Sequence, residues 1–313
     1  MANEAIGASE RGRVFDLEPV TPILLFGTER SGTKWLCNIL SNAPDVACVT
    51  GEHFGGIIET NMFRTIGQKF DLRSPDDYAA FIELWTRSDF FLNIGLDRDW
   101  FTELLRRKGW PADPIDVFDL AMTAFANRGG RKFWLQKAAP EDGSSLPRRF
   151  PHAKLLVIAR GRSETVRSVQ ELARRRGSPI SHFEAVYGHV VQTKMLRELR
   201  RRHPVCWVPY EDLLQEPAAE IARVCRHIGI PCSPELLDIR FERNSSFDQV
   251  DEGRTEAPLR RVAEGVYAAL CSGIPLALAR GRSNIARAVK GRAGRSDAFV
   301  HDTFASSKDK LGL

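Results

Sequence analysis

The residues best suited to chemistry lie between positions 27 and 35, where the chain reads Gly-Thr-Glu-Arg-Ser-Gly-Thr-Lys-Trp. An apolar run, Ile23–Phe26, precedes them, and a helical pattern that includes Leu36 and Ile39 follows. A strand, a glycine-bounded loop and a helix in this order aim backbone N–H groups and the positive helix end at one point. The segment therefore predicts a phosphate-binding loop.

The loop departs from the nucleoside-triphosphatase motif, in which two glycines separated by four residues precede Lys and Ser or Thr. Gly27 and Gly32 match the glycines, but Thr33 stands where the lysine is required, and Lys34 comes one place late. Trp35 replaces the hydroxyl that binds Mg²⁺. The sequence therefore favours a nucleotide that does not need this metal, and we expect no metal requirement.

Strands and helices that could position this loop recur along the chain. Helical patterns at 163–176, at 180–199 and after Pro217 separate most of the short apolar runs. This alternation predicts an α/β fold with a P-loop-like, mostly parallel sheet of about five strands, flanked by helices. The expected strands are Ile23–Phe26, Val46–Val49, Phe133–Leu135, Leu155–Ala159 and Val205–Val208.

We expect one domain over residues 21–300, between a loose arm at 1–20 and a tail at 301–313. Residues 55–130 interrupt the alternation, because they are rich in aromatic residues and mostly helical in pattern. They predict a helical cap above the carboxyl ends of the strands, where ligands bind in such folds. The aromatic residues could serve helix packing, line an acceptor pocket, or do both.

Composition narrows the class of protein. The chain of 313 residues has a net charge of +5, which favours polyanionic ligands without naming one. We find no secretory signal and no apolar run near the roughly 20 residues that span a bilayer, so we expect a cytoplasmic protein without a membrane span. We interpret the cysteines as reduced core residues, with neither disulfides nor a metal site. They are Cys37, Cys48, Cys206, Cys225, Cys232 and Cys271.

A second phosphate element follows the fourth expected strand. Arg160 stands at the strand end, and Ser168 lies about two turns into the next helix. The serine hydroxyl can therefore meet a phosphate that Arg160 grips with paired N–H donors. With this spacing and the first loop, the chain resembles sulfotransferases that use 3′-phosphoadenosine 5′-phosphosulfate (PAPS), particularly bacterial ones. The resemblance covers most of residues 21–260.

The resemblance implies that PAPS is the co-substrate and adenosine 3′,5′-bisphosphate the product. Arg30 would bind the 5′-phosphosulfate oxygens. Lys34 replaces a common Thr, and whether it reaches phosphate or solvent stays open. Trp35 either stacks on adenine or packs in the core. The implied nucleotide-binding residues are Arg30, Ser31, Gly32, Thr33, Lys34, Trp35, Arg160, Ser168, Tyr210, Ser245, Ser246 and Phe247.

The resemblance also implies an in-line transfer of the sulfuryl group to an acceptor hydroxyl. Lys137 would stabilise the leaving group, as a lysine before a proline does in relatives, although Pro140 comes one residue late here. Glu52 is the expected base, because a carboxylate in a low-dielectric site can accept the proton of the acceptor. His53 competes with Glu52 for this role, and Glu141 and Asp142 are outside candidates.

Two other classes remain as alternatives. A nucleoside-triphosphate-dependent kinase would require Mg²⁺, and the displaced Lys34 argues against it. A nucleic-acid-binding protein could use Arg174–Arg176 and the basic segment 277–295, but no known nucleic-acid module is present, so we expect no such partner. The basic segment is otherwise a solvated face, or it meets an anionic acceptor or a membrane surface. The acceptor is unidentified, and a homodimer is one option for the oligomeric state.

Overall fold

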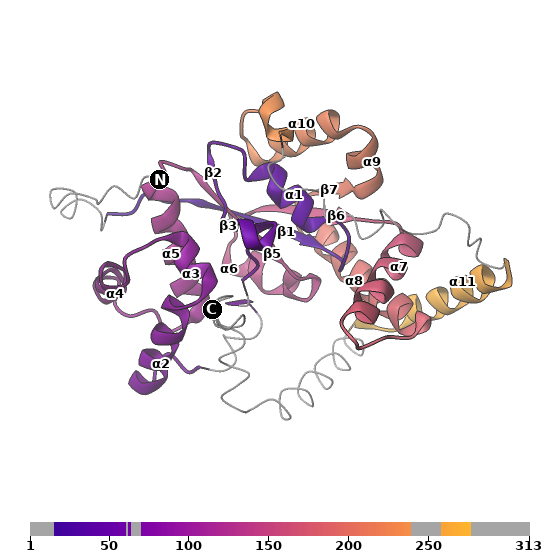
Figure 1. Ribbon diagram of the computed structural model, residues 1–313, viewed down its shortest axis with the longest axis horizontal. Helices are drawn as coiled ribbons and strands as arrows, with labels where there is room; N and C mark the ends of the chain where they lie inside the picture. The colour runs from indigo at the N-terminus through magenta and orange to yellow at the C-terminus, as the bar shows by residue number, and fades with distance from the viewer. Residues whose placement is uncertain (1–15, 61, 64–69, 239–257, 277–313) are drawn as a thin grey trace.

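The computed structural model describes residues 16–60, 62–63, 70–238 and 258–276 (Figure 1). Its main sheet has five strands in the order β2-β5-β1-β6-β7, and every neighbouring pair is parallel. The predicted α/β fold with helices flanking a parallel sheet is therefore confirmed. The strands are β1 (Thr21–Gly27), β2 (Val46–Ala47), β5 (Phe133–Ala138), β6 (Lys154–Ala159) and β7 (Val205–Pro209).

The second strand is shorter than predicted, because the chain leaves the sheet at Ala47 instead of Val49. The Val49 carbonyl accepts a hydrogen bond from the Ile58 N–H at 2.9 Å. Between these residues, β3 (Thr50–Gly51) pairs antiparallel with β4 (Gly56–Ile57). The backbone groups that were expected to extend the parallel sheet thus form a small hairpin of their own.

Alternating side chains of β1 divide the core into two layers. Ile23 and Leu25 face one side of the sheet, Leu24 and Phe26 face the other, and all four are fully buried. Burial on both sides explains why the strand reads as a continuous apolar run. The side of Ile23 is covered by α1 (Thr33–Leu40), α9 (Tyr210–Gln215) and α10 (Pro217–Ile228).

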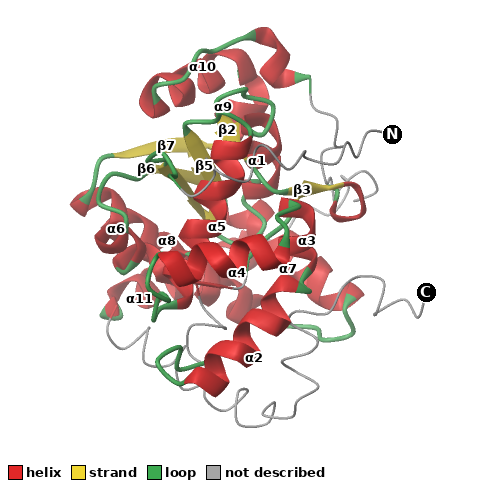
Figure 2. Ribbon diagram, turned by 90° about the vertical axis from the view of Figure 1, so that its left-hand side faces the viewer, coloured by secondary structure: helices red, strands yellow, loops and turns green. Residues whose placement is uncertain are grey.

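The opposite face of the sheet carries most of the remaining helices, as Figure 2 shows below the strands. Those that bury side chains against it are α5 (Pro114–Arg128), α6 (Leu146–Arg149) and α8 (His182–Arg202). Beside α8 lie α7 (Arg162–Arg175) and α11 (Pro258–Gly273). The helices predicted at 163–176, at 180–199 and after Pro217 are confirmed as α7, α8 and α10.

The predicted cap region contains α2 (Pro75–Thr86), α3 (Asp89–Ile94) and α4 (Arg98–Arg107) before α5. Trp85 is buried, with its ring centroid 5.1 Å from that of Phe91 and 5.5 Å from that of Phe101. These rings share one core with Phe118 of α5 and Trp134 of β5. The packing role of these aromatic residues is thus confirmed, whereas a role in acceptor binding stays a prediction.

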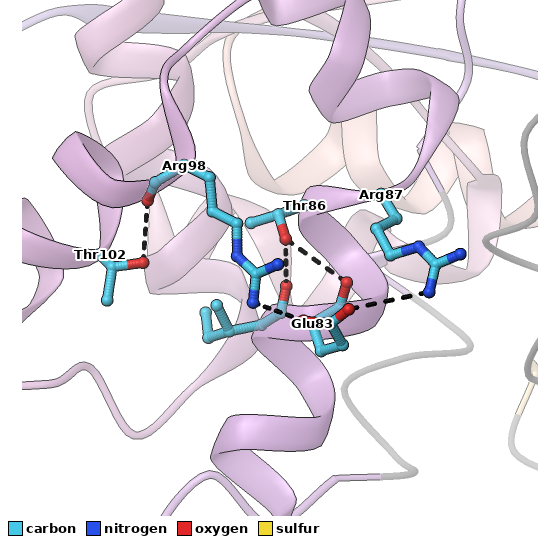
Figure 3. A network of polar contacts seen from close by, with 6 residues as sticks. Glu83, Thr86, Arg87, Arg98 and Thr102 are labelled. Atoms are coloured by element: carbon cyan, nitrogen blue, oxygen red, sulfur yellow. Dashed lines mark hydrogen bonds and ion pairs between the residues drawn. The ribbon is translucent and has the colours of Figure 1, made fainter.

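Polar contacts on the outside of the cap join α2 to α4 (Figure 3). Glu83 forms an ion pair with Arg98, and its other oxygen lies 3.7 Å from an Arg87 nitrogen. Because all three side chains are well exposed, each pair contributes at most about 1 kcal/mol. The aromatic core, rather than these contacts, therefore holds the cap helices together.

The predicted N-terminal arm and C-terminal tail can be compared with the residues that the structure describes. Of the predicted arm at 1–20, residues 1–15 lie outside the described part, and Glu18 exchanges two backbone-to-side-chain hydrogen bonds with Asn127 of α5. The tail at 301–313 also lies outside the described part.

All six cysteines are free thiols, and only Cys232 is exposed. In the described ranges, we find no helix with the length and hydropathy needed to cross a lipid bilayer.

Candidate functional site

The loop after β1 folds into a tight turn. Ser31 is fully buried, and both its N–H and its hydroxyl donate to the Thr28 carbonyl, at 3.2 Å and 2.8 Å. Arg30 and Gly32 adopt left-handed backbone conformations, with φ of 62° and 93°. The helix α1 then begins at Thr33. A turn of this kind directs successive N–H groups to one side, as an anion-binding loop requires.

Glycine is required at both ends of this loop. A Cβ atom on Gly27 would lie 2.5 Å from Ser31 Oγ and 2.9 Å from the Ile158 carbonyl oxygen. A Cβ atom on Gly32 would lie 2.6 Å from a ring carbon of Tyr210. The two predicted glycines therefore let the loop lie directly against β6 and the start of α9.

The two predicted phosphate elements are in contact. Arg30 Nε donates to Ser168 Oγ at 3.0 Å, and Ser168 is buried in α7. The residues are 138 positions apart in the sequence. They meet because β1 and β6 are neighbouring parallel strands, so that the segments after both strands leave the same edge of the sheet. This edge is where ligands bind in open α/β folds.

An aromatic pair lies beside Arg160, the other predicted phosphate ligand. The Arg160 guanidinium carbon is 4.5 Å from the centre of the Tyr210 ring. The Trp35 ring meets Tyr210 edge-on, with centroids 5.8 Å apart, and packs against the core beneath α1. Of the two roles considered for Trp35, core packing is therefore observed, and stacking on adenine stays a prediction.

Positive charge gathers around the loop. Burial is the main cause that lowers the pKa of the Arg30 guanidinium, and the negative charge of Glu29 opposes it. The positive charges of Arg160, Arg176 and Arg175 lower the pKa further. An anion bound among these side chains would relieve their mutual repulsion, since opposite charges stabilise the ionised form.

Two buried hydroxyls add to the fit of an anionic ligand. Thr28 Oγ1 in the loop and Thr165 Oγ1 in α7 have no hydrogen-bond partner within the part of the chain that the structure describes. Buried polar atoms normally have a partner, and one left without it costs free energy. The residues of this edge are thus suited to a ligand that carries several acceptor oxygens.

A turn that carries Glu52 and His53 is fastened to α1. This 3₁₀ turn, η2 (Glu52–Phe54), accepts a hydrogen bond at the Phe54 carbonyl from Lys34 Nζ. Asn38 Nδ2 donates to the next carbonyl, that of Gly55, at 3.1 Å. Glu52 and His53 are both exposed. In this structure Lys34 therefore contacts the protein rather than solvent, and its contact with phosphate stays a prediction.

The structure reveals one charged partner that sequence reasoning missed. Lys137, at the end of β5, forms an ion pair with Glu59 through a contact of 2.7 Å between Nζ and Oε1. Burial is the main cause that lowers the pKa of Lys34. The negative charge of Glu59 raises this pKa, and the positive charge of Lys137 lowers it further. Glu59 follows an apolar dipeptide and belongs to no motif, so only the chain path after β4 could have revealed it.

The described residues do not include every predicted site residue, and they give one outside candidate a local contact. Ser245, Ser246 and Phe247 lie outside the described residues. Asp142, an outside candidate for the base, is buried in the turn η4 (Pro140–Ser144) and accepts a hydrogen bond from the Ala139 N–H at 3.2 Å. Within the described ranges, no three His, Cys, Asp or Glu side chains are grouped so as to hold a metal ion.

Comparison with protein families gives a match over most of the chain. The model described as "Sulfotransferase family" matches residues 22–234, which include the loop, the turn after β3 and the start of α7. No curated protein sequence matches the chain.

Solved structures similar to this one include three examples. A sulfotransferase domain from the curacin biosynthetic pathway has a TM-score of 0.49 and 13% identity, covering 72% of this chain and 80% of its own. A sulfotransferase from Mycobacterium tuberculosis H37Rv has a TM-score of 0.45 and 14% identity. The match covers 93% of this chain and 78% of that chain. A retinol dehydratase, solved with retinol and PAP, has a TM-score of 0.35 and 15% identity. The match covers 74% of this chain and 66% of that chain.

Replacing Gly32 with alanine should disturb the loop and the aromatic pair together. We expect Gly32→Ala to lower the free energy of unfolding by about 1–3 kcal/mol, because the left-handed backbone and the Tyr210 ring both oppose a Cβ atom. Gly188→Ala is the matched control, since its Cβ would meet nothing within 4 Å inside α8. The control should be stabilised by about 0.5–1 kcal/mol. Urea unfolding measures the free energy of unfolding of both variants. An equal change in the two variants would contradict the packing described.

Proposed function

Because the chain belongs to the sulfotransferase family, we propose that it transfers the sulfuryl group of PAPS to an acceptor hydroxyl. The contact between Arg30 and Ser168 is the observation that supports this proposal, because it brings the elements predicted for the 5′- and the 3′-phosphate next to each other, as binding of one nucleotide requires. The bond from sulfur to the acceptor oxygen forms as the bond from sulfur to the 5′-phosphate oxygen breaks. Adenosine 3′,5′-bisphosphate leaves as the product.

The chain offers separate groups for the two ends of the nucleotide. The backbone N–H groups of the loop, with the Arg30 guanidinium, would hold the 5′-phosphosulfate. Arg160, positioned by the Tyr210 ring, would bind the 3′-phosphate. A tetrahedral anion with several oxygens can also use the buried hydroxyls of Thr28 and Thr165. Alignment of the donor by these groups is the main contribution that a protein makes to such transfers.

Charge that develops on the leaving phosphate requires a nearby cation. We assign this role to Lys137, whose ammonium forms an ion pair with Glu59 at 2.7 Å. Lys137 would exchange the carboxylate for phosphosulfate oxygens on binding. Lys34, which donates to the Phe54 carbonyl, then serves to position the turn that carries the base.

The proton of the acceptor hydroxyl would pass to Glu52. This carboxylate is exposed, and not in the low-dielectric surroundings expected from the sequence. It lies on a turn that two side chains of α1 hold in place, so an acceptor can reach it. His53, the next residue on the same turn, is the competing base. The fold of the turn supports either residue equally, and the choice between them is a matter for kinetics.

Nucleotide selectivity is the first test. We expect adenosine 3′,5′-bisphosphate to raise the melting temperature more than 5′-AMP or ATP with Mg²⁺, because a ligand stabilises the folded state it binds. Arg160→Ala should weaken bisphosphate binding about 10- to 100-fold, through loss of charge-assisted hydrogen bonds, and leave 5′-AMP nearly unaffected. Arg167→Ala, at an exposed position of α7, is the control. A preference for Mg-ATP would instead indicate a kinase.

The base is tested by a pair of neighbouring variants. With PAPS and a hydroxyl acceptor chosen by screening, Glu52→Gln should lower kcat about 100-fold or more, because the amide cannot take the proton. Its affinity for adenosine 3′,5′-bisphosphate should not change. His53→Gln should retain most of kcat. The reverse pattern in single-turnover measurements would move the role of base to His53.

Glu59 should compete with the nucleotide for Lys137. We expect Glu59→Gln to tighten binding of adenosine 3′,5′-bisphosphate up to about fivefold, since a partly exposed ion pair is worth at most about 1 kcal/mol. Glu83→Gln, which breaks a similarly exposed pair in the cap, should leave the affinity unchanged. Isothermal titration measures both. Weaker binding by Glu59→Gln would mean that the carboxylate positions Lys137 for the ligand rather than competing with it.

A further inference from the structure

The helix α11 is anchored to the domain along one face. Glu264, which is 3% exposed, accepts a hydrogen bond from Arg162 Nε at 2.7 Å and lies 3.0 Å from His182 Nε2. Ala268, one turn later, is buried against side chains of α7 and α8. At the end of the helix, Lys194 Nζ donates to the Ser272 and Ile274 carbonyls. The helix is therefore a fixed part of the fold.

The opposite face of α11 is apolar and exposed. Val262, Val266 and Leu270 are spaced by four residues, which places them on one side of a helix. Their exposed fractions are 64%, 58% and 69%. No element within the described ranges covers them, and α11 lies at the margin of the molecule, on the side away from the cap (Figure 1). The outward face of a surface helix is normally polar, so an exposed apolar stripe marks a candidate interaction surface.

The sequence directly after the helix is strongly basic. Between positions 277 and 295 it contains six Arg or Lys residues and no Asp or Glu, a net charge of +6. The described chain ends at Leu276, three residues beyond α11, so this charge follows the helix directly in the sequence. The basic residues are Arg280, Arg282, Arg287, Lys290, Arg292 and Arg295.

We propose that the outward face of α11 inserts into the surface of an anionic lipid membrane, with the basic segment held against the lipid headgroups. Stable attachment to a membrane surface generally needs two signals, apolar insertion and electrostatic attraction, and the sequence carries both in consecutive segments. The buried face of α11 would then fix the domain at the membrane. Arg162, which Glu264 holds, lies two residues after the predicted phosphate ligand Arg160, so the candidate site would lie near the lipid.

The charge of this region favours lipid over two other partners. A second copy of the chain would bring an identical segment of +6 alongside the first, and the two would repel each other. Nucleic acid would satisfy the basic segment, but its phosphate backbone offers nothing to an apolar stripe. An anionic bilayer presents both an apolar interior and a negative surface, and it therefore matches both features.

Co-sedimentation of the full chain with lipid vesicles tests the proposal. We expect binding to vesicles of phosphatidylcholine mixed with phosphatidylglycerol, and little binding to phosphatidylcholine alone. The triple variant Val262→Ser, Val266→Ser, Leu270→Ser should bind at least about tenfold more weakly, because less apolar area enters the lipid. Leu92→Ser is the control, since it removes an exposed leucine from α3 in the cap, away from α11.

A charge variant and the oligomeric state complete the test. Arg287→Glu with Lys290→Glu should weaken binding to the anionic vesicles at least about tenfold. Thermal unfolding checks that both variants remain folded. The proposal is overturned if the wild type does not bind anionic vesicles, or if the serine variant binds as the wild type does. A wild-type dimer in sedimentation velocity that becomes monomeric in the serine variant would overturn it too, because a second copy would then cover the stripe.

Discussion

The need to hold many positive charges at one edge of the sheet constrains the rest of the structure. Like charges in a partly buried place repel each other, and burial alone already lowers the pKa of Arg30. Each of these cationic side chains makes a different kind of contact. Arg30 donates to a serine hydroxyl, Lys137 pairs with a carboxylate, and the Arg160 guanidinium lies over an aromatic ring. Lys34 donates to a backbone carbonyl.

These contacts differ in how readily a ligand can replace them. A hydroxyl is a weak partner for a guanidinium, so an anion near Arg30 would gain a charge-assisted hydrogen bond at little cost. The pair of Lys137 with Glu59 is partly exposed, which makes it weak as well. The contact of Lys34 with the Phe54 carbonyl instead holds a turn in place. The same cluster therefore contains side chains ready to bind and side chains that support the site.

The sheet topology explains why the cluster forms at this edge. The central strand β1 has β5 on one side and β6 on the other, and all three run in the same direction. The loop at 28–32 after β1, Lys137 at the end of β5 and Arg160 after β6 consequently lie at the same edge of the sheet. The hairpin β3–β4 brings Glu52 and Glu59 back toward α1 from the neighbouring strand. The aromatic core of the cap continues the core under the sheet, and it thereby supports this hairpin region from the other side.

Elements with local signals could be predicted from the amino-acid sequence. The loop at 27–35, the spacing of Arg160 and Ser168, and the parallel strands could be read from it, because glycine position, apolar run length and helical period act over short distances. Tertiary structure alone decided that Arg30 meets Ser168, that Glu59 holds Lys137, and that β2 ends early at Ala47. These outcomes depend on which segments become neighbours across the sheet, and no local pattern encodes a contact between residues 138 positions apart.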